Sequence, residues 1–323
     1  MIRNLQDFKE IAKNKEFNHI FFLSSPIVVF ISKLIIEEFS IPEKNIFVVP
    51  FRNTNTDLIS NNLINQESSL IDRVIKKYFL FSYQGIKLRK KVETFSNKFI
   101  LYSDWDNRET LELLNSKNCF GNAYIEEGQL SFHKFYEYPF KRNRILQWMR
   151  LFRWNQNIKK MPREADVPVF NEIFNDKAFG LFTISKKAFP YINNEKKYIF
   201  KDFEAIKKSY RPRILGTKNI GIMCSPRRFK NEDWEITINN FIDLLPNKSA
   251  IKLHPAYFAN DKYLDKFIKI FNKNNFKNLT ICDNSIILEA EMLFEKKTLY
   301  GPMTSLNTYA PLLGSEFIDI SIY

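Results

Sequence analysis

Short apolar runs alternate with segments of helical periodicity along most of this chain. Runs of nearly continuous apolar residues are typical of strands buried on both faces of a sheet. Four such runs occupy residues 19–23, 46–49, 99–102 and 123–125. Apolar positions at helical spacing predict helices at residues 4–15, 26–39, from about 69 and from about 106. This alternation predicts a parallel sheet with helices on both faces.

The same alternation restarts in the last third of the chain. Five further apolar runs predict strands at residues 220–224, 250–253, 279–282, 298–300 and 317–320. Residues 201–216 are charged and contain Pro212 and Gly216, which favours a linker there. We therefore predict an α/β protein in which two Rossmann-like domains, residues 1–210 and 211–323, face each other across a cleft.

The middle of the chain, at about residues 132–160, is basic and aromatic. Within it Trp148 and Phe152 lie at helical spacing among several arginines. One interpretation is a helix, at residues 142–154, that rests on an anionic membrane. The other is a helix between domains whose aromatic side belongs to the core. The pattern leaves both open.

The net charge of the chain favours some classes of binding partner but does not select one. Lysine and arginine number 49 against 36 acidic residues, for a formal net charge of +13, which suits phosphate-bearing ligands, polyanions or an anionic membrane surface. The chain has no uninterrupted apolar run of the ~18 residues that a membrane-spanning helix needs. Its polar start is unlike a signal peptide. We expect a cytoplasmic protein, with peripheral contact at the inner face of the membrane as one option.

The cysteines and two of the three histidines favour structural roles. Cys119, Cys224 and Cys282 lie in apolar surroundings without CxxC spacing, which predicts buried free thiols in a reducing compartment. His19 and His133 have no partner at the spacing of metal ligands, so we predict no metal site from them.

The third histidine lies where ligands meet open α/β sheets. Residues 249–255 read as a short apolar strand that stops at His254 and Pro255. Proline has a fixed φ and no donor, so it ends the strand and favours an extended histidine. Ligands bind outside the carboxyl ends of such strands, and a histidine there can carry a proton or donate to an anion. A histidine that only ends a strand remains the plainer interpretation.

An acidic pair ends a strand in the other half. Glu126 and Glu127 follow the apolar run at residues 123–125, and Gly128 allows a sharp turn beside a ligand. Two adjacent acids repel, so one takes up a proton more readily, as a general base near neutral pH requires. Most acidic pairs in loops are only solvated charges, so each motif alone is weak. Together they suggest an acid/base pair acting across a cleft.

These motifs resemble those of bacterial sialyltransferases and polysialyltransferases. The likeness rests on Tyr124-Ile-Glu-Glu-Gly128, Lys252-Leu-His-Pro255 and Thr304-Ser305, in that order, and spans roughly residues 18–323. The family implies a two-domain GT-B fold and metal-independent use of CMP-sialic acid, with no further cofactor. It also implies an acceptor-binding first domain and a CMP-sugar-binding second domain. The acceptor would be a terminal sugar, such as galactose, of a capsule, O-antigen or lipooligosaccharide intermediate.

The resemblance implies a role for each matching residue. Glu126, with Glu127 as the alternative, would take the proton from the acceptor hydroxyl, and His254 would protonate or hydrogen-bond the departing phosphate. Thr304 and Ser305 would hold that phosphate, unless they only cap a helix. Further candidates come from the ends of other predicted strands and from one predicted helix. Contacts to nucleotide or substrate are expected from Pro255, Gly128, Ser225, Arg227, Glu289, Ser24 and Ser25.

Three rival interpretations remain. Asp104 and Asp106 form a DxD pattern that could hold Mg²⁺ or Mn²⁺ and a nucleoside diphosphate. His-Pro also resembles transferases of other CMP-ulosonic acids and of CDP-polyols, so the donor could differ. A basic nucleic-acid-binding protein fits the charge, but the chain contains no recognisable module for it, so nucleic acid is not an expected partner.

Overall fold

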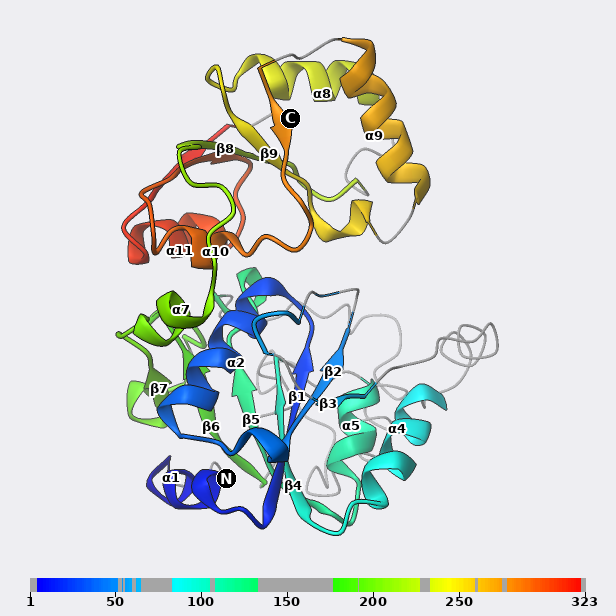
Figure 1. Cartoon of the computed structure of the whole chain (residues 1–323), viewed down its shortest axis with the longest axis vertical. Helices are drawn as coiled ribbons and strands as arrows, with labels where there is room; N and C mark the ends of the chain where they lie inside the picture. The colour runs from blue at the N-terminus through cyan, green and yellow to red at the C-terminus, as the bar shows by residue number, and fades with distance from the viewer. Residues whose placement is uncertain are drawn as a thin grey trace, which may run out of the picture. The chain divides into compact units, whose positions relative to one another are not determined.

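The computed structural model describes residues 5–51, 54, 56–59, 62–64, 83–104, 108–132, 177–190, 192–226, 233–258, 261–274 and 278–320. Within them the chain forms two compact units, one of residues 5–51 and 56–202 and the other of residue 54 and residues 203–320. Each unit contains its own parallel sheet (Figure 1). The helix predicted from about residue 69, nearly all of the basic aromatic segment, Asp106, His133 and Arg227 lie outside the described residues.

The first unit is built on a sheet of seven described strands in the order β3-β2-β1-β4-β5-β6-β7. The inner strand β1 pairs in parallel on both sides, with Phe21 opposite Val48 and opposite Tyr102. Almost every residue of β1 is buried, as its continuous apolar run predicts. The strands are β1 (Phe17–Leu23), β2 (Ile46–Pro50), β3 (Asn62–Leu63), β4 (Lys98–Ser103), β5 (Cys119–Ile125), β6 (Ala178–Thr183) and β7 (Lys197–Ile199).

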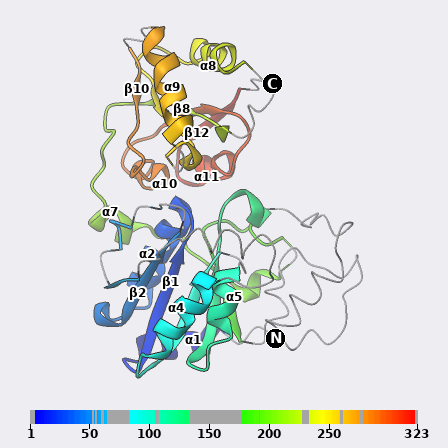
Figure 2. The same cartoon turned by 90° about the vertical axis from the view of Figure 1, so that its right-hand side faces the viewer.

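Helices cover both faces of this sheet. The helix α2 (Pro26–Glu38) lies on one face, and α4 (Tyr83–Glu93) and α5 (Arg108–Leu114) lie on the other (Figures 1 and 2). Pro26 occupies the first turn of α2, where its missing N–H costs nothing. The first helix, α1 (Leu5–Lys13), joins the α2 side.

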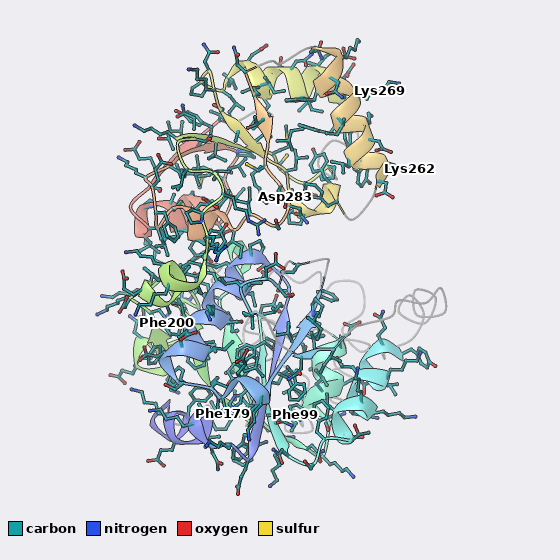
Figure 3. The ribbon with its side chains drawn as sticks, viewed as in Figure 1. Phe99, Phe179, Phe200, Lys262, Lys269 and Asp283 are labelled. Atoms are coloured by element: carbon teal, nitrogen blue, oxygen red, sulfur yellow. The ribbon has the colours of Figure 1, made fainter. Side chains whose placement is uncertain are left out.

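Aromatic side chains fill much of this core. Phe8 of α1 lies 4.9 Å from Phe39 and 5.2 Å from Phe182, measured between ring centroids. Phe179 packs with Phe8, whereas Phe99 packs into the cluster beneath α4 and α5 (Figure 3). The two faces of one sheet therefore have separate cores, which accounts for strands without polar alternation.

The second unit repeats the plan with five described strands in the order β10-β9-β8-β11-β12, all parallel. The strands are β8 (Asn219–Ile222), β9 (Ala250–Lys252), β10 (Thr280–Ile281), β11 (Thr298–Gly301) and β12 (Glu316–Asp319). The helices are α7 (Glu204–Ser209), α8 (Trp234–Asp243), α9 (Asp261–Lys273), α10 (Leu288–Glu291) and α11 (Leu306–Leu312).

One face of the second sheet packs against α8 and α9. Phe241 and Phe267 are fully buried there against Ile251 of β9. The opposite side of α9 points Lys262 and Lys269 away from the sheet (Figure 3). The amphipathic pattern of α9 is thus satisfied within the unit.

The α/β class and the two Rossmann-like parallel sheets are as predicted. Every predicted strand that falls in the described ranges is present, with ends that differ by a few residues. Three strands of the first sheet, β3, β6 and β7, were not predicted, and α7 lies inside the segment predicted as a linker. Among the described residues no helix is both long and apolar enough to cross a membrane.

Candidate functional site

Polar side chains gather at the carboxyl edge of the first sheet. Neighbouring parallel strands β1, β4, β5 and β6 end next to one another. The residues that follow these four ends include Ser24, Asp104, Glu126 and Ser185, and all four are buried. This is the edge at which open parallel sheets meet their ligands.

Ser24 and Asp104 form a direct contact at this edge. The Ser24 hydroxyl donates to Asp104 Oδ2 at 2.5 Å. The neighbouring Ser25 holds the N-cap position of α2, yet its hydroxyl makes no cap hydrogen bond. That oxygen is buried and has no hydrogen-bond partner among the described residues. The predicted pair Ser24 and Ser25 therefore splits into one bonded hydroxyl and one that remains to be satisfied.

Glu126 is fully buried and bonded to the next strand. Its Oε2 accepts the backbone N–H groups of Ile184, at 2.8 Å, and Ser185, at 3.3 Å. These two N–H groups follow β6, so the carboxylate joins the end of β5 to the end of β6. Such contacts satisfy buried backbone donors that would otherwise lack a partner.

Glu127 has a different environment from its neighbour. It is half-buried, and its backbone N–H donates to Ser131 Oγ at 2.9 Å. Gly128 follows with φ of 114°, a backbone conformation that disfavours a side chain, so the predicted sharp turn is present. Of the two adjacent acids before this turn, Glu126 is therefore the fully buried one and Glu127 the half-buried one.

Lys197 of β7 is a residue that the sequence gave no reason to select. Its side chain is buried, and burial lowers the pKa of its ammonium group, while the nearby carboxylate of Glu126 raises it. Nζ also donates to the carbonyl oxygen of Lys186 at 3.5 Å. A cation and a carboxyl group that lie near each other each favour the charged form of the other.

The carboxyl edge of the second sheet brings three predicted residues to neighbouring strands. Parallel strands β9, β8 and β11 lie side by side. His254 follows β9, Ser225 follows β8 and Thr304 follows β11. These three residues, about 30 to 80 positions apart in sequence, therefore lie at one edge of one sheet.

The geometry of His254 fixes which nitrogen carries its proton when the ring is neutral. The residue is exposed and caps the short helix η7 (Pro255–Tyr257), which begins at Pro255. Its Nδ1 accepts the backbone N–H of Ala256 at 3.1 Å. Because Nδ1 acts as the acceptor, the proton of the neutral imidazole lies on Nε2, which becomes a donor.

A buried lysine holds the loop next to His254. Lys252 of β9 donates from Nζ to the carbonyl oxygens of Asp283, at 2.8 Å, and Asn284, at 3.0 Å. Burial lowers the pKa of Lys252 to about 8, opposed by Cys282, Glu289 and other nearby acids. The lysine thus fixes the loop that follows β10, beside the strand that ends at His254.

Glu289 lies in the same cluster, on α10. Its side chain is buried, which raises its pKa above the ordinary value, while Lys252 acts in the opposite direction. Glu289 is therefore not a solvated helix glutamate, which is the plainer role for an acid on a helix. A buried acid next to a sheet edge is a candidate for binding ligand hydroxyls.

Thr304 and Ser305 are half-buried before α11. Thr304 Oγ1 accepts the backbone N–H of Leu306 at 3.3 Å, whereas the Ser305 side chain makes no cap hydrogen bond. Helix capping thus accounts for one hydroxyl and not for the other. The strand before them ends at Gly301, where an added Cβ would lie 2.7 Å from the carbonyl oxygen of Ile222.

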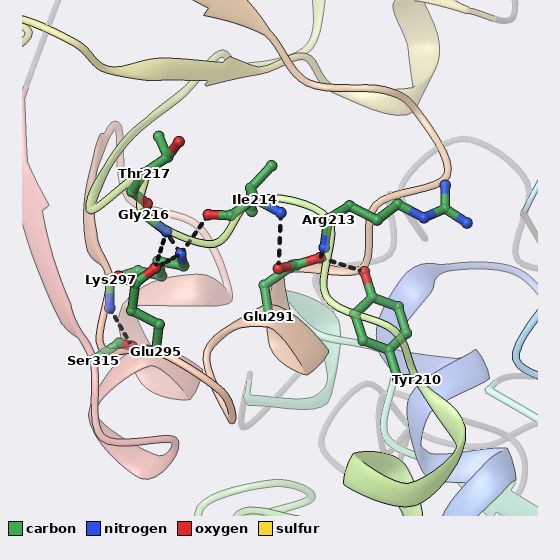
Figure 4. A network of polar contacts seen from close by, with 9 residues as sticks. All are labelled: Tyr210, Arg213, Ile214, Gly216, Thr217, Glu291, Glu295, Lys297 and Ser315. Carbon is green, nitrogen blue, oxygen red and sulfur yellow. Dashed lines mark hydrogen bonds and ion pairs between the residues drawn. The ribbon is translucent and has the colours of Figure 1, made fainter.

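A network around Glu291 joins the entry of the second unit to α10 (Figure 4). Glu291 is fully buried, and its Oε1 accepts the Tyr210 hydroxyl at 2.7 Å and the Arg213 backbone N–H at 2.8 Å. Nearby, Lys297 Nζ donates to the carbonyl oxygens of Ile214 and Thr217. In sequence these charged residues look like solvated ones, so no pattern identified them.

The described residues were searched for groups of side chains that could bind a metal ion. Within those ranges no three His, Cys, Asp or Glu side chains gather as ligands of one ion. Of the DxD pattern, Asp104 is described and bonds to Ser24, while Asp106 lies outside the described residues.

The sequence matches no model of a known protein family and no curated protein. Several solved structures are similar to this chain. One is a UDP-GlcNAc 2-epimerase from Neisseria meningitidis bound to UDP-GlcNAc, with TM-score 0.49, 11% identity, and coverage of 94% of this chain and 82% of that one. A glycosyltransferase from Rickettsia africae gives TM-score 0.39 and 8% identity, over 95% and 79% of the two chains. The wall teichoic acid polymerase TagF gives 0.44 and 12%, over 98% and 74%.

Proposed function

We propose that this chain is an inverting, metal-independent glycosyltransferase that moves sialic acid from CMP-sialic acid to a hydroxyl of a terminal sugar. The acceptor would belong to a bacterial surface glycan or glycolipid intermediate, with galactose as the first sugar to test. The observation that carries the proposal is His254. It follows an inner strand of a parallel sheet, and its neutral form has Nε2 as the donor.

The reaction is a displacement at the anomeric carbon. The acceptor oxygen loses its proton to a carboxylate and forms a bond to that carbon as the bond to the CMP phosphate oxygen breaks. The electron pair leaves with the phosphate, and His254 Nε2 donates to the oxygen on which charge develops. Donors directed at developing charge are the groups that lower a barrier most. Attack opposite to the leaving group inverts the anomeric centre.

We assign the general base to Glu127 rather than to Glu126. Glu126 is fully buried, and Oε2 is engaged by two backbone N–H groups after β6. Glu127 is half-buried just before the turn at Gly128, so it is the more accessible residue of the two. A general base must come within hydrogen-bond reach of the hydroxyl that it deprotonates. Glu126 then positions the strand end that carries Glu127.

The remaining candidates divide between donor and acceptor. Ser305 and Ser225, half-buried at the edge that includes His254, are suited to phosphate oxygens. Glu289 is suited to the ribose hydroxyls. At the first sheet, Ser25 follows β1 at the carboxyl edge, and we assign it to the acceptor side.

Thermal melting with nucleotides tests this proposal. A ligand that binds only the folded protein raises its melting temperature. We expect CMP to raise it equally with Mg²⁺ and with EDTA, and UDP and GDP to have little effect. A shift with UDP or GDP that requires Mg²⁺ would instead support a metal site at Asp104 and Asp106. Competition by CMP-ulosonic acids and CDP-polyols then separates the possible donors.

A further inference from the structure

Arg213 lies on the segment that enters the second unit, and its backbone is fixed by a buried carboxylate. Its N–H donates to Glu291 Oε1 at 2.8 Å, and the N–H of Ile214 donates to Oε2 at 3.3 Å. The Tyr210 hydroxyl binds the same Oε1. Glu291 is fully buried, so three contacts on one immobile carboxylate hold this part of the segment.

The guanidinium end of Arg213 is fixed as well. Its Nη1 donates to the hydroxyl of Ser285, and Ser285 bonds to Asp283 Oδ1 through both its hydroxyl and its backbone N–H, the latter at 2.7 Å. Lys252 holds the other side of this loop through the carbonyl oxygens of Asp283 and Asn284. The arginine is nonetheless exposed, and Figure 4 shows its side chain extending away from Glu291.

This guanidinium belongs to the edge that includes His254. Strands β9 and β10 are parallel neighbours, with Ile251 opposite Ile281. His254 and Asn284 each lie three residues beyond that matched pair, so the loop bonded to Arg213 runs beside His254. A fixed cation therefore accompanies a histidine donor at adjacent strand ends.

We propose that Arg213 binds the phosphate of the nucleotide donor, a role that rests on the proposed function. A guanidinium stays charged throughout the physiological range and presents five N–H donors in a planar fork that matches phosphate oxygens. A guanidinium with five donors can hold Ser285 and an oxyanion together. A side chain already fixed at both ends loses little freedom on binding, which raises affinity. The carboxylate of Asp283 orients the guanidinium through Ser285.

Equilibrium binding of CMP and of cytidine to the full chain tests this role, because the two ligands differ by the phosphate alone. We expect Arg213→Ala to weaken CMP binding ~10-fold to 100-fold, the range for lost hydrogen bonds to a charged group, and to leave cytidine binding unchanged. Arg213→Lys should fall between, because an ammonium lacks the fork. Arg211→Ala is the matched control, since Arg211 is exposed on the same segment, and it should bind CMP as the wild type does.

Each other outcome overturns the assignment. Unchanged CMP affinity in Arg213→Ala removes it, and equal weakening of CMP and cytidine assigns the effect to the fold. If Arg213→Ala weakened the binding of CMP-sialic acid but not that of CMP, the ligand of the guanidinium would instead be the carboxylate of the sugar. If the wild type binds uridine nucleotides and not CMP, the proposed function fails separately, and UMP against uridine then tests Arg213 in the same way.

Discussion

At the scale of single residues, adjacent acids in this chain have different surroundings. Glu126 bonds to backbone groups of the neighbouring strand, while Glu127 is partly accessible on a glycine turn. The sequence placed both at a strand end but could not distinguish them, because burial depends on β6, which the residue pattern did not reveal. The tautomer of His254 likewise depends on an N–H two residues further on.

We expect Glu127→Gln and His254→Ala each to lower turnover ~10²-fold or more, the usual scale of general acid–base catalysis, with melting temperatures close to that of the wild type. Steady-state kinetics with CMP-sialic acid and a galactoside measures this effect. Full activity of either variant would remove that residue from the mechanism.

Glu126→Ala should instead destabilise the protein, by about 1–3 kcal/mol, because it leaves two buried N–H groups without their acceptor. Urea unfolding of this variant beside Glu127→Ala measures the difference. Equal stabilities for the two alanine variants would contradict the separation of roles.

Lys252 should make stability depend on alkaline pH. Its pKa is about 8 in the folded protein against 10.5 as the ordinary value, so between these pH values the unfolded chain binds more protons. Stability then rises with pH across that window. Urea unfolding at pH 7.5 and 10 should show the wild type gaining stability relative to Lys252→Met. A difference that stays constant with pH would mean that Lys252 titrates as it does in water.

At the scale of elements, continuous apolar runs were sufficient to predict most strands. The runs that became β1, β2, β4 and β5 are buried on both faces, so their pattern has one interpretation. β7 has three residues, and β6 carries Gly180, so neither gives a strong periodic signal. Helix caps were predicted less accurately, since Ser25 occupies the N-cap position of α2 without a cap hydrogen bond.

Gly301 couples two strands of the second sheet. A methyl group at this position would lie 2.7 Å from the carbonyl oxygen of Ile222, so β8 or β11 must shift. We expect Gly301→Ala to lower the melting temperature and to weaken CMP binding, because both Ser225 and Thr304 follow these strands. Gly216→Ala, where no atom lies within 4 Å, tests the effect of strain alone at a position with φ of 81°.

At the scale of the whole molecule, the sequence predicted two parallel sheets and could not predict the buried charges that support them. Three of these buried charged residues lie in segments whose sequence looks half-exposed: Lys252, Glu291 and Lys197. Their hydrogen-bond partners are backbone carbonyl and N–H groups distant in sequence. Tertiary partners of this kind leave no local pattern. The division into two units has a direct experimental consequence.

If CMP binds the second unit, amide hydrogen exchange should slow at the ends of β8, β9 and β11 and stay unchanged at β2 and β5. Exchange of buried amides reports local opening, which a bound ligand suppresses. Mass spectrometry with and without CMP measures it peptide by peptide. Protection confined to the first unit would reverse the assignment of donor and acceptor.

The buried thiols give each unit its own chemical reporter. Cys119 lies in the first sheet, and Cys224 and Cys282 lie in the second unit, all three buried. Burial raises the pKa of Cys119 to about 12 and that of Cys282 to about 11, so little thiolate exists in the folded chain. Since alkylating reagents attack the thiolate, each cysteine reacts only when its own unit opens. The order in which the three become labelled would therefore record which half of the molecule unfolds first.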